Sequence, residues 1–287
     1  MGDSLELGAG PAVGDAEFAF FRDLIHRNTG IALKDAKRSM VAARLARRLR
    51  ALGLDSFAGY RRFLETADPS GTELALMINC ITTNKTSFFR EEEHFATLAD
   101  HILAAERAGQ KVYRVWSAAC STGEEPYSIA MTALAGPRRM EVRILASDLD
   151  TEVLARAQQA EYPLESLAGM DDPSKRRYFL RGRGERLGWA QVKPEVREMV
   201  TFRRINLVGE LWAIPAHFDA IFCRNVIIYF DRGTQRRLFG RLTQYLAPGG
   251  LLFVGHAETL FWLGELLEAV DHSVYRARIS APVCETS

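Results

Sequence analysis

Apolar residues recur at helical spacing in the first third of the chain and change to short continuous runs further on. Helical spacing over the first third predicts one amphipathic helix from Asp15 to a C-cap at Gly30. A second helix is predicted from Asp35 to Leu52, and two more over Phe57–Glu65 and Gly71–Cys80. With no strand pattern among them, residues 15–81 are predicted to form a small all-α domain.

From residue 111 onward, predicted strands alternate with predicted helices. The strands are Lys111–Trp116, Val142–Asp148, Phe218–Asn225 and Leu251–Gly255, and the helices are Glu92–Ala108, Glu125–Ala135, Thr151–Gln159 and Gly233–Leu246. Ala247–Gly250 is interpreted as a turn. Such alternation is typical of a parallel, doubly wound α/β sheet.

Glycine-separated short runs interrupt this alternation at about residues 172–203, and they predict a small antiparallel ribbon inserted into the sheet domain. The remaining boundaries follow from composition. Residues 1–14 and 281–287 are predicted to be tails, residues 82–95 a linker, and residues 96–280 the sheet domain.

Composition narrows the class of protein. The chain has 287 residues, 47% of them hydrophobic and 25% charged, which are globular values. No apolar stretch approaches ~18 residues, so no membrane-inserted segment is expected. The N-terminus lacks a signal-peptide pattern, and the four cysteines, Cys80, Cys120, Cys223 and Cys284, have no metal-site spacing. A reducing, cytoplasmic location and a site without metal are expected.

The net charge is +1, but the charged residues are distributed unevenly along the chain. Residues 15–64 hold 11 Lys and Arg against 5 Asp and Glu, a local charge of +6. Lys37, Arg44 and Arg48 lie on one stripe of the second predicted helix. The stripe is either a solvated face or a docking face for an acidic partner.

The segment from Val115 to Ala130 combines the end of a strand, a turn of small residues and the start of a helix. That arrangement binds nucleotide-like ligands in open α/β sheets. Glu124 and Glu125 follow the turn, and there is neither a phosphate-binding lysine nor a G-x-G-x-x-G motif. Phosphate-bearing cofactors are therefore disfavoured, and S-adenosylmethionine, which carries a sulfonium and an ammonium, is favoured.

Asp148 ends the second predicted strand, where doubly wound folds accept hydrogen bonds from ribose hydroxyls. Its alternative role is to cap the next helix. Asp150 and Thr151 are available for that cap, so Asp148 is assigned to the ligand. Glu124 is interpreted as a first-turn helix charge, Cys120 and Cys223 as buried small residues, and His256 as structural or peripheral.

Six ordered segments carry a family resemblance. They are Thr82–Glu91, Trp116–Ser128, Ser147–Asp150, Asn206–Leu207, Phe218–Phe230 and Pro248–Gly250. Together they resemble the chemotaxis receptor methyltransferases, the CheR family, over roughly residues 15–278. The resemblance implies a small helical domain, a Rossmann-like methyltransferase domain and an inserted β-subdomain.

The resemblance also implies methyl transfer from S-adenosylmethionine to glutamate side chains of chemoreceptor cytoplasmic helices. By resemblance, the cofactor positions are Asn84, Thr86, Arg90, Glu125, Asp148, Asn206, Leu207, Asn225 and Val226. The positions nearest the chemistry are Arg90 and Tyr229. The partners would be methyl-accepting receptors at the inner membrane face, bound by a monomer. Some family members also bind a receptor C-terminal pentapeptide through the β-subdomain.

For two residues, Arg90 and Tyr229, the sequence leaves two possible roles open. Arg90 can orient a carboxylate or form a surface ion pair with Glu92 or Glu93, and Tyr229 can donate to the substrate or pack in the core. Two other functions are weighed. A nucleic-acid methyltransferase is disfavoured because the basic residues have few interleaved aromatics. A non-enzymatic cofactor-binding adaptor is disfavoured because it needs no substrate-side residues.

Overall fold

The computed structural model describes residues 12–136, 139–214 and 217–278, and the chain divides into two compact units, Met1–Thr83 and Asn84–Ser287. The boundary lies inside the segment predicted as a linker. The predicted tail over 281–287 and most of the tail over 1–14 lie outside the described residues. Val13 is described, and it is buried against the core of the first unit.

The first unit is helical, as predicted. Its elements are α1 (Asp15–Thr29), a 3-10 turn η1 (Asp35–Lys37), α2 (Arg38–Leu52), α3 (Phe57–Thr66) and α4 (Thr72–Ile81). Gly30 and Gly53 end α1 and α2 with φ of 74° and 65°, the left-handed conformation that glycine adopts at little cost. The apolar stripe of α2, Val41, Leu45 and Leu49, is buried in one core with α1, α3 and α4.

Two arginines of α2 are bound inside this unit. Arg48 pairs through two nitrogens with the buried carboxylate of Glu73, at 2.9 and 2.6 Å, and Tyr60 donates to the same carboxylate at 2.7 Å. Arg44 donates to the carbonyls of Ile81 and Thr82 at the C-terminal end of α4. A cation there satisfies carbonyls that the helix leaves without partners.

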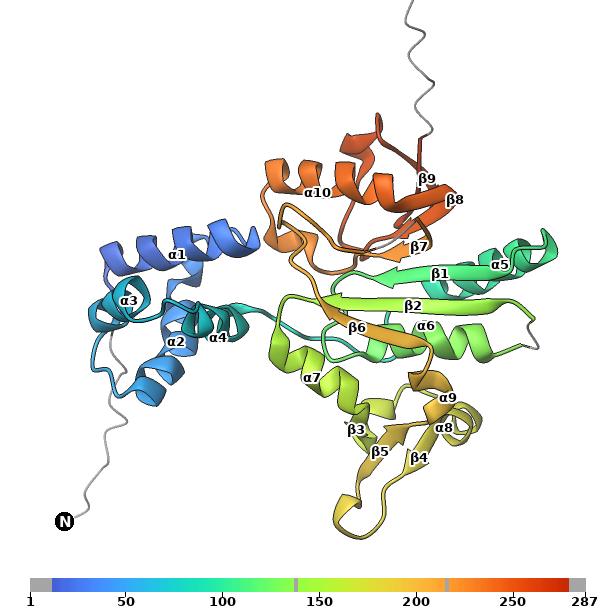
Figure 1. Cartoon of the computed structure of the whole chain (residues 1–287), viewed down its shortest axis with the longest axis horizontal. Coiled ribbons are helices and arrows are strands. Elements are labelled where there is room, and N and C mark those ends of the chain that lie inside the picture. The colour runs from blue at the N-terminus through green and yellow to red at the C-terminus, as the bar shows by residue number, and fades with distance from the viewer. Residues whose placement is uncertain (1–11, 137–138, 215–216, 279–287) are drawn as a thin grey trace, which may run out of the picture. The chain divides into compact units, whose positions relative to one another are not determined.

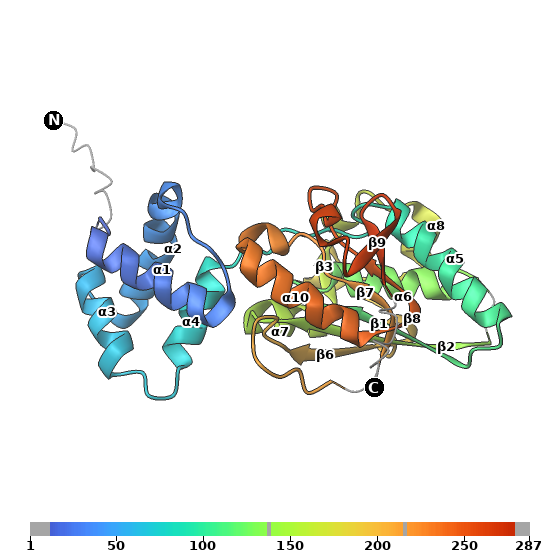
Figure 2. The ribbon, with the colours of Figure 1, turned by 90° about the horizontal axis from the view of Figure 1, so that it is seen from above.

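The second unit contains a seven-stranded sheet in the order β6-β2-β1-β7-β8-β10-β9 (Figures 1 and 2). The strands are β1 (Val112–Ser117), β2 (Glu141–Asp148), β6 (Val200–Arg204), β7 (Phe218–Phe222), β8 (Leu246–Phe253), β9 (Leu267–Asp271) and β10 (Val274–Ala277). Neighbours from β6 to β8 are parallel, whereas β10 is antiparallel to β8 and β9. The parallel part was predicted from the sequence, and the β9–β10 hairpin was not.

Helices cover both faces of this sheet. They are α5 (Glu93–Arg107), α6 (Glu124–Leu134), α7 (Thr151–Gln159) and α10 (Arg232–Tyr245). Because strand side chains alternate, Tyr113 and Val115 of β1 enter the core that α6 closes, whereas Trp116 packs on Tyr245 of α10. No helix among the described residues is long and apolar enough to cross a bilayer.

The inserted subdomain differs from its predicted bounds. Its three strands, β3 (Glu161–Pro163), β5 (Trp189–Val192) and β4 (Phe179–Arg181), form an antiparallel sheet in that order. Short helices α8 (Asp172–Tyr178) and α9 (Pro194–Arg197) and 3-10 turns η2 (Leu164–Leu167) and η3 (Gly184–Arg186) accompany them. Val200–Phe202, predicted in the ribbon, belongs to β6 and pairs with β2. Alternation shows that a segment is a strand but not which strand it pairs with.

Two strand ends also differ from prediction. β7 ends at Phe222, three residues before the predicted end at Asn225, and Asn225 itself has φ of 57°, outside the extended conformation. Ala247–Gly250 is a bulge inside β8, where four residues lie opposite Asp219 between the pairs Phe218–Leu246 and Ala220–Leu251. A Cβ on Gly250 would lie 3.0 Å from the Phe218 carbonyl oxygen, so only glycine fits this bulge.

The Arg48–Glu73 contact predicts a stability difference between adjacent arginines. Arg48→Met leaves the buried Glu73 carboxylate without its cation and should lower the free energy of unfolding by about 2–3 kcal/mol. Arg47→Met, at an exposed neighbour, should change it by less than about 0.5 kcal/mol. All four tryptophans lie in the second unit, so the loss should appear in far-ultraviolet circular dichroism and not in tryptophan fluorescence. Equal effects of the two substitutions would contradict this role.

Candidate active site

Four loops meet at one edge of the large sheet. They follow the carboxyl ends of the adjacent parallel strands β2, β1, β7 and β8. The chain leaves β1 toward β2 on one side, and β7 lies on the other. That change of direction opens a crevice outside the strand ends, which is where open α/β sheets bind ligands.

The turn after β1 packs on α7. Gly123 has φ of 96°, and a Cβ there would lie 2.9 Å from the Ala157 Cβ and 2.8 Å from the Tyr162 hydroxyl. Tyr162 donates to the Thr122 carbonyl at 2.7 Å. Glycine is therefore required at position 123, because the turn packs closely against Ala157 and Tyr162.

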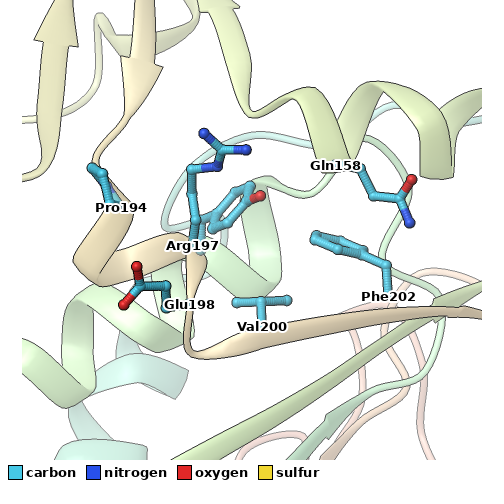
Figure 3. Close-up of a pocket in the computed structure, with 7 residues that line it drawn as sticks. Gln158, Pro194, Arg197, Glu198, Val200 and Phe202 are labelled. Atoms are coloured by element: carbon cyan, nitrogen blue, oxygen red, sulfur yellow. The ribbon is translucent and has the colours of Figure 1, made fainter.

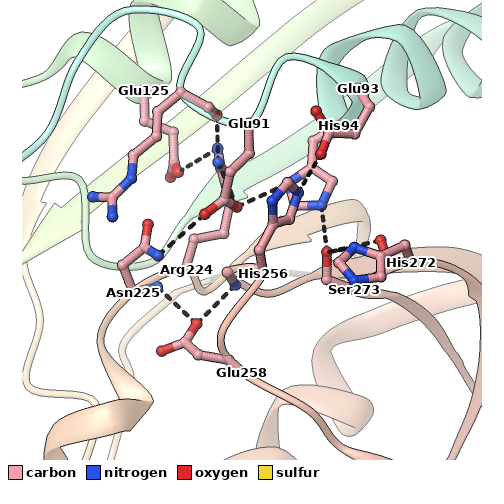
Figure 4. Close-up of polar contacts among 12 residues, drawn as sticks. Glu91, Glu93, His94, Glu125, Arg224, Asn225, His256, Glu258, His272 and Ser273 are labelled. Atoms are coloured by element: carbon pink, nitrogen blue, oxygen red, sulfur yellow. Dashed lines mark hydrogen bonds and ion pairs between the residues drawn. The ribbon is translucent and has the colours of Figure 1, made fainter.

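Arg224, directly after β7, connects three segments at this edge (Figure 4). Its side chain is only 2% exposed. The guanidinium pairs with Glu91 at 2.9 Å and with Glu125 at 3.2 Å, and it also donates to the Arg90 carbonyl. Glu125 is held from its other side by the Ser117 hydroxyl at 2.7 Å. The start of α6, the segment before α5 and the end of β7 are thereby fixed to one another.

Two carboxylates share the charge of Arg224. Burial opposes the ionisation of Glu91, yet the Arg224 charge with hydrogen bonds from Arg224 and Asn225 outweighs it and lowers the pKa of Glu91. Burial is the larger effect at Glu125 and raises its pKa despite Arg224 and Ser117. A positively charged ligand beside Glu125 would favour its ionised form, as Arg224 does.

The loop after β2 is fixed by backbone hydrogen bonds. Asp148 accepts from the Ser121 amide at 2.9 Å and from the Asp150 amide at 3.0 Å, and burial raises its pKa. Asp150 caps α7 by accepting from the amides of residues 152 and 153, which confirms that the cap falls beyond Asp148. Asn84 donates to Asp150 at 2.8 Å and accepts from the Ser121 hydroxyl at 2.9 Å, so it joins this loop to the β1 turn.

Glu258 holds the loop after β7. Its side chain is buried, and its carboxylate accepts from four backbone amides, those of Gly255, Asn225, Ile227 and Ile228, at 2.7 to 3.3 Å. Ile227–Tyr229 is the 3-10 turn η4. A Cβ on Gly255 would lie 2.3 Å from the side-chain Nδ2 of Asn225 and 3.0 Å from Glu258 Oε2, so a larger residue here would displace both side chains.

The structure brings most of the predicted site residues to this edge. Arg90, Glu125 and Asn225 meet around Arg224 and Glu91, and Asn84 and Asp148 meet around Ser121 and Asp150. Val226 and Tyr229 lie in the loop that Glu258 holds, and Thr86 is half-buried between Asn84 and Arg90.

Asn206 and Leu207 follow β6, next to Ile205, whose amide donates to the Asp148 carbonyl at 3.1 Å. Arg90 donates to the Lys85 carbonyl at 3.0 Å and forms no ion pair with Glu92 or Glu93 among the described residues. Cys120 and Cys223 are buried, and burial raises the pKa of both thiols.

Three residues that hold the site together received no role in the sequence interpretation: Glu91, Arg224 and Glu258. The sequence could have indicated a role for Arg224, because a charged residue that follows the buried strand Phe218–Phe222 closely needs a buried partner. No local sequence pattern indicates a role for Glu91 or Glu258, since their partners are 133 and 33 residues away from them in the chain.

A cavity of about 420 Å³ lies away from these residues, at α6, α7, α9 and β6 (Figure 3). It is lined by Tyr127, Gln158, Pro194, Arg197, Glu198, Val200 and Phe202. None of the predicted site residues lines it.

Comparisons with known proteins cover both units. The family model described as the CheR methyltransferase all-alpha domain matches residues 16–82, and the model described as the CheR methyltransferase SAM binding domain matches residues 84–276. "Chemotaxis protein methyltransferase 2" of Pseudomonas aeruginosa is 46% identical over 92% of this chain and 96% of its own length. "Chemotaxis protein methyltransferase" of Escherichia coli K12 is 46% identical over 92% of this chain and 91% of its own. The Salmonella typhimurium protein of that name is 48% identical over 86% of this chain and 85% of its own.

The four amide contacts of Glu258 predict a large effect from a small change. In Glu258→Gln, an amide group replaces one carboxylate oxygen and can no longer accept at that position. We expect the free energy of unfolding of the second unit to fall by about 2–3 kcal/mol, measured by tryptophan fluorescence in denaturant. Glu265→Gln, at a half-exposed surface pair with Arg236, is the matched control. Equal midpoints for the two variants would contradict the assigned role.

Proposed function

The chain belongs to the CheR methyltransferase family, and on that basis we propose that it transfers a methyl group from S-adenosylmethionine to glutamate side chains on chemoreceptor cytoplasmic helices. The product is a glutamate methyl ester. The observation that carries the proposal is that identity to named chemotaxis protein methyltransferases extends over both units, not over the cofactor-binding domain alone. The names of these relatives do not favour a nucleic-acid methyltransferase or an adaptor.

The residues at the strand ends fit the cofactor. S-adenosylmethionine supplies a methyl group on a sulfonium, together with an ammonium and a ribose and without phosphate. Glu125 provides a carboxylate that can pair with the positive charge of the cofactor, and Asp148 stands at the strand end where ribose hydroxyls are bound. We assign to cofactor binding Asn84, Thr86, Arg90, Glu125, Asp148, Asn206, Leu207, Asn225 and Val226.

The proposed reaction needs no acid–base catalysis. A glutamate side chain with a pKa near ~4.3 is already an anion at neutral pH, so it needs no general base. The protein's task is to align one carboxylate oxygen with the methyl group and to keep water away. Residues that hold and orient the substrate should therefore matter more than residues that move protons.

Arg90 and Tyr229 are the residues we assign to the substrate carboxylate. Arg90 donates one N–H to the Lys85 carbonyl, and a guanidinium has five such donors, so others remain for a carboxylate. Tyr229 is half-buried rather than packed in the core, at the end of the turn that Glu258 holds. Its hydroxyl can fix the orientation of the attacking oxygen.

Receptor docking is assigned to the 3-10 turn η1 and to α2 of the first unit, which together carry the predicted basic stripe. Lys37 is exposed and available to an acidic helix. Arg44 and Arg48 belong to the same predicted stripe, but both make contacts inside the unit. We infer that Lys37 meets the receptor directly and that Arg44 and Arg48 contribute mainly by holding α2 in place.

The small sheet offers a second contact. β4 is one of its edges, and Leu180, Leu187 and Trp189 are large apolar side chains exposed on it or beside it. An extended peptide can add to such an edge. We propose that this sheet binds a receptor C-terminal segment, and that a cytoplasmic monomer is recruited in this way to receptor arrays.

Ester chemistry gives the first test. When the protein is mixed with receptor-containing membranes and S-adenosylmethionine tritiated at the methyl group, label should appear on the receptor. Mild alkali should release it as methanol, because a carboxyl ester hydrolyses there. Alkali-stable label would place the methyl group on nitrogen or another atom and would contradict the glutamate assignment.

Arg90→Ala tests the substrate side. Loss of the orienting guanidinium should lower the rate of methyl transfer by at least about 100-fold, while the unfolding midpoint stays that of the parent protein. Arg107→Ala, at an exposed arginine that ends α5, is the control. Full activity in Arg90→Ala would remove this residue from the mechanism.

A further inference from the structure

Glu91, His94 and His256 form a cluster beside the Arg224 contacts, in which one potential ligand atom of each residue lies within 4.8 Å of the others (Figure 4). The residues come from the segment before α5, from α5 itself and from the loop after β8. We propose that this cluster is a binding site for a divalent transition-metal ion of the zinc class, separate from the residues assigned to the methyl donor and the receptor carboxylate.

His94 provides the observation that points to a ligand. Its ring is fully buried, and its Nδ1 has no hydrogen-bond partner among the described residues. The nearest acid oxygen, Oε2 of Glu91, is 3.6 Å away, which is too far for a hydrogen bond. An orphaned buried polar atom costs free energy unless something fills the gap.

The tautomer of His94 follows from its neighbours. The Ser273 hydroxyl donates to the His272 carbonyl at 2.7 Å, because a carbonyl can only accept. Ser273 therefore accepts from His94 Nε2, 2.8 Å away, and the ring proton lies on Nε2. Nδ1 then presents a lone pair toward the Glu91 carboxylate. Glu91 Oε2 accepts from Arg224 on its other side, and a cation between this oxygen and the Nδ1 lone pair would stabilise both.

His256 is oriented in a similar way. Its Nε2 pairs with the carboxylate of Glu93, which leaves Nδ1 as the nitrogen available for a metal. Histidines that bind metals commonly use one ring nitrogen for the ion and the other for a carboxylate or another hydrogen-bond partner. Both histidines of the cluster meet this description, His94 through Ser273 and His256 through Glu93.

The geometry requires a small adjustment. Metal–nitrogen bonds of about 2.0–2.1 Å place tetrahedral ligand atoms about 3.3–3.4 Å apart. The His256 side chain is 38% exposed, so it can move inward and also leaves a path for the ion. Arg224 neutralises part of the Glu91 charge, whereas Glu93 supplies a second carboxylate behind His256. Two imidazoles and one carboxylate favour zinc-class ions over magnesium or calcium, which prefer oxygen ligands.

Cobalt(II) is the probe that tests the site, since its visible absorption reports both coordination number and ligand type. The full-length protein, stripped of metal with a chelator, is titrated with Co²⁺ without methyl donor or receptor. We expect saturation at one equivalent, intense bands of four- or five-coordinate cobalt, no thiolate charge-transfer band, and displacement by Zn²⁺. No saturable binding, or a thiolate band, would overturn the proposal.

Matched variants locate the ion. Glu93→Gln should weaken Co²⁺ binding by about 10–100-fold because it removes the partner that orients His256, whereas Glu92→Gln, at the exposed neighbouring acid, should not change it. His256→Gln should abolish saturable binding, and His217→Gln, at another exposed histidine of this unit, should not. Wild-type affinity in His256→Gln would refute the site. Because no methyl transfer is measured, failure here leaves the proposed function untouched.

Discussion

The buried guanidinium of Arg224 is the interaction on which the site depends. A charge that is 2% exposed is tolerated only when it is fully paired, and leaving such a charge without its partner costs several kcal/mol. The partners of Arg224 come from two separate parts of the second unit: Glu91 and the Arg90 carbonyl before α5, and Glu125 at the start of α6. Satisfying this one side chain therefore forces the segment that carries Arg90 against the carboxyl ends of β1 and β7.

Around that centre, the other loops are fixed by carboxylates that accept from backbone amides. Glu258 holds the loop of Asn225 and Tyr229, Asp148 holds the turn after β1, and Asp150 caps α7. All of these contacts are made within the chain itself. They hold the loops in place, which suits a reaction that needs alignment rather than proton transfer.

The sequence predicts local structure and the family well, but not long-range partners. Helical spacing gave α1 to α4, and runs of buried residues gave β1, β2 and β7, because those patterns reflect local periodicity. It misplaced Val200–Phe202, because the pairing of this segment with β2 is decided by a strand far away in the chain. It missed the β9–β10 hairpin, because both strands are short and most of β9 is not buried, so the apolar pattern is weak. In the same way, the position of Asp148 at a strand end could be predicted from local pattern, whereas the contact of Glu91 with Arg224 spans 133 residues and leaves no local pattern.

The most direct test of this account measures the affinity of S-adenosylhomocysteine by isothermal titration calorimetry in Arg224→Lys. Lysine keeps the positive charge but lacks the planar fork that reaches Glu91, Glu125 and the Arg90 carbonyl together. The account predicts binding at least about tenfold weaker than in the parent protein, with Arg236→Lys, at the half-exposed pair with Glu265, unchanged. Equal affinity in Arg224→Lys and the parent protein would contradict the claim that Arg224 assembles the site.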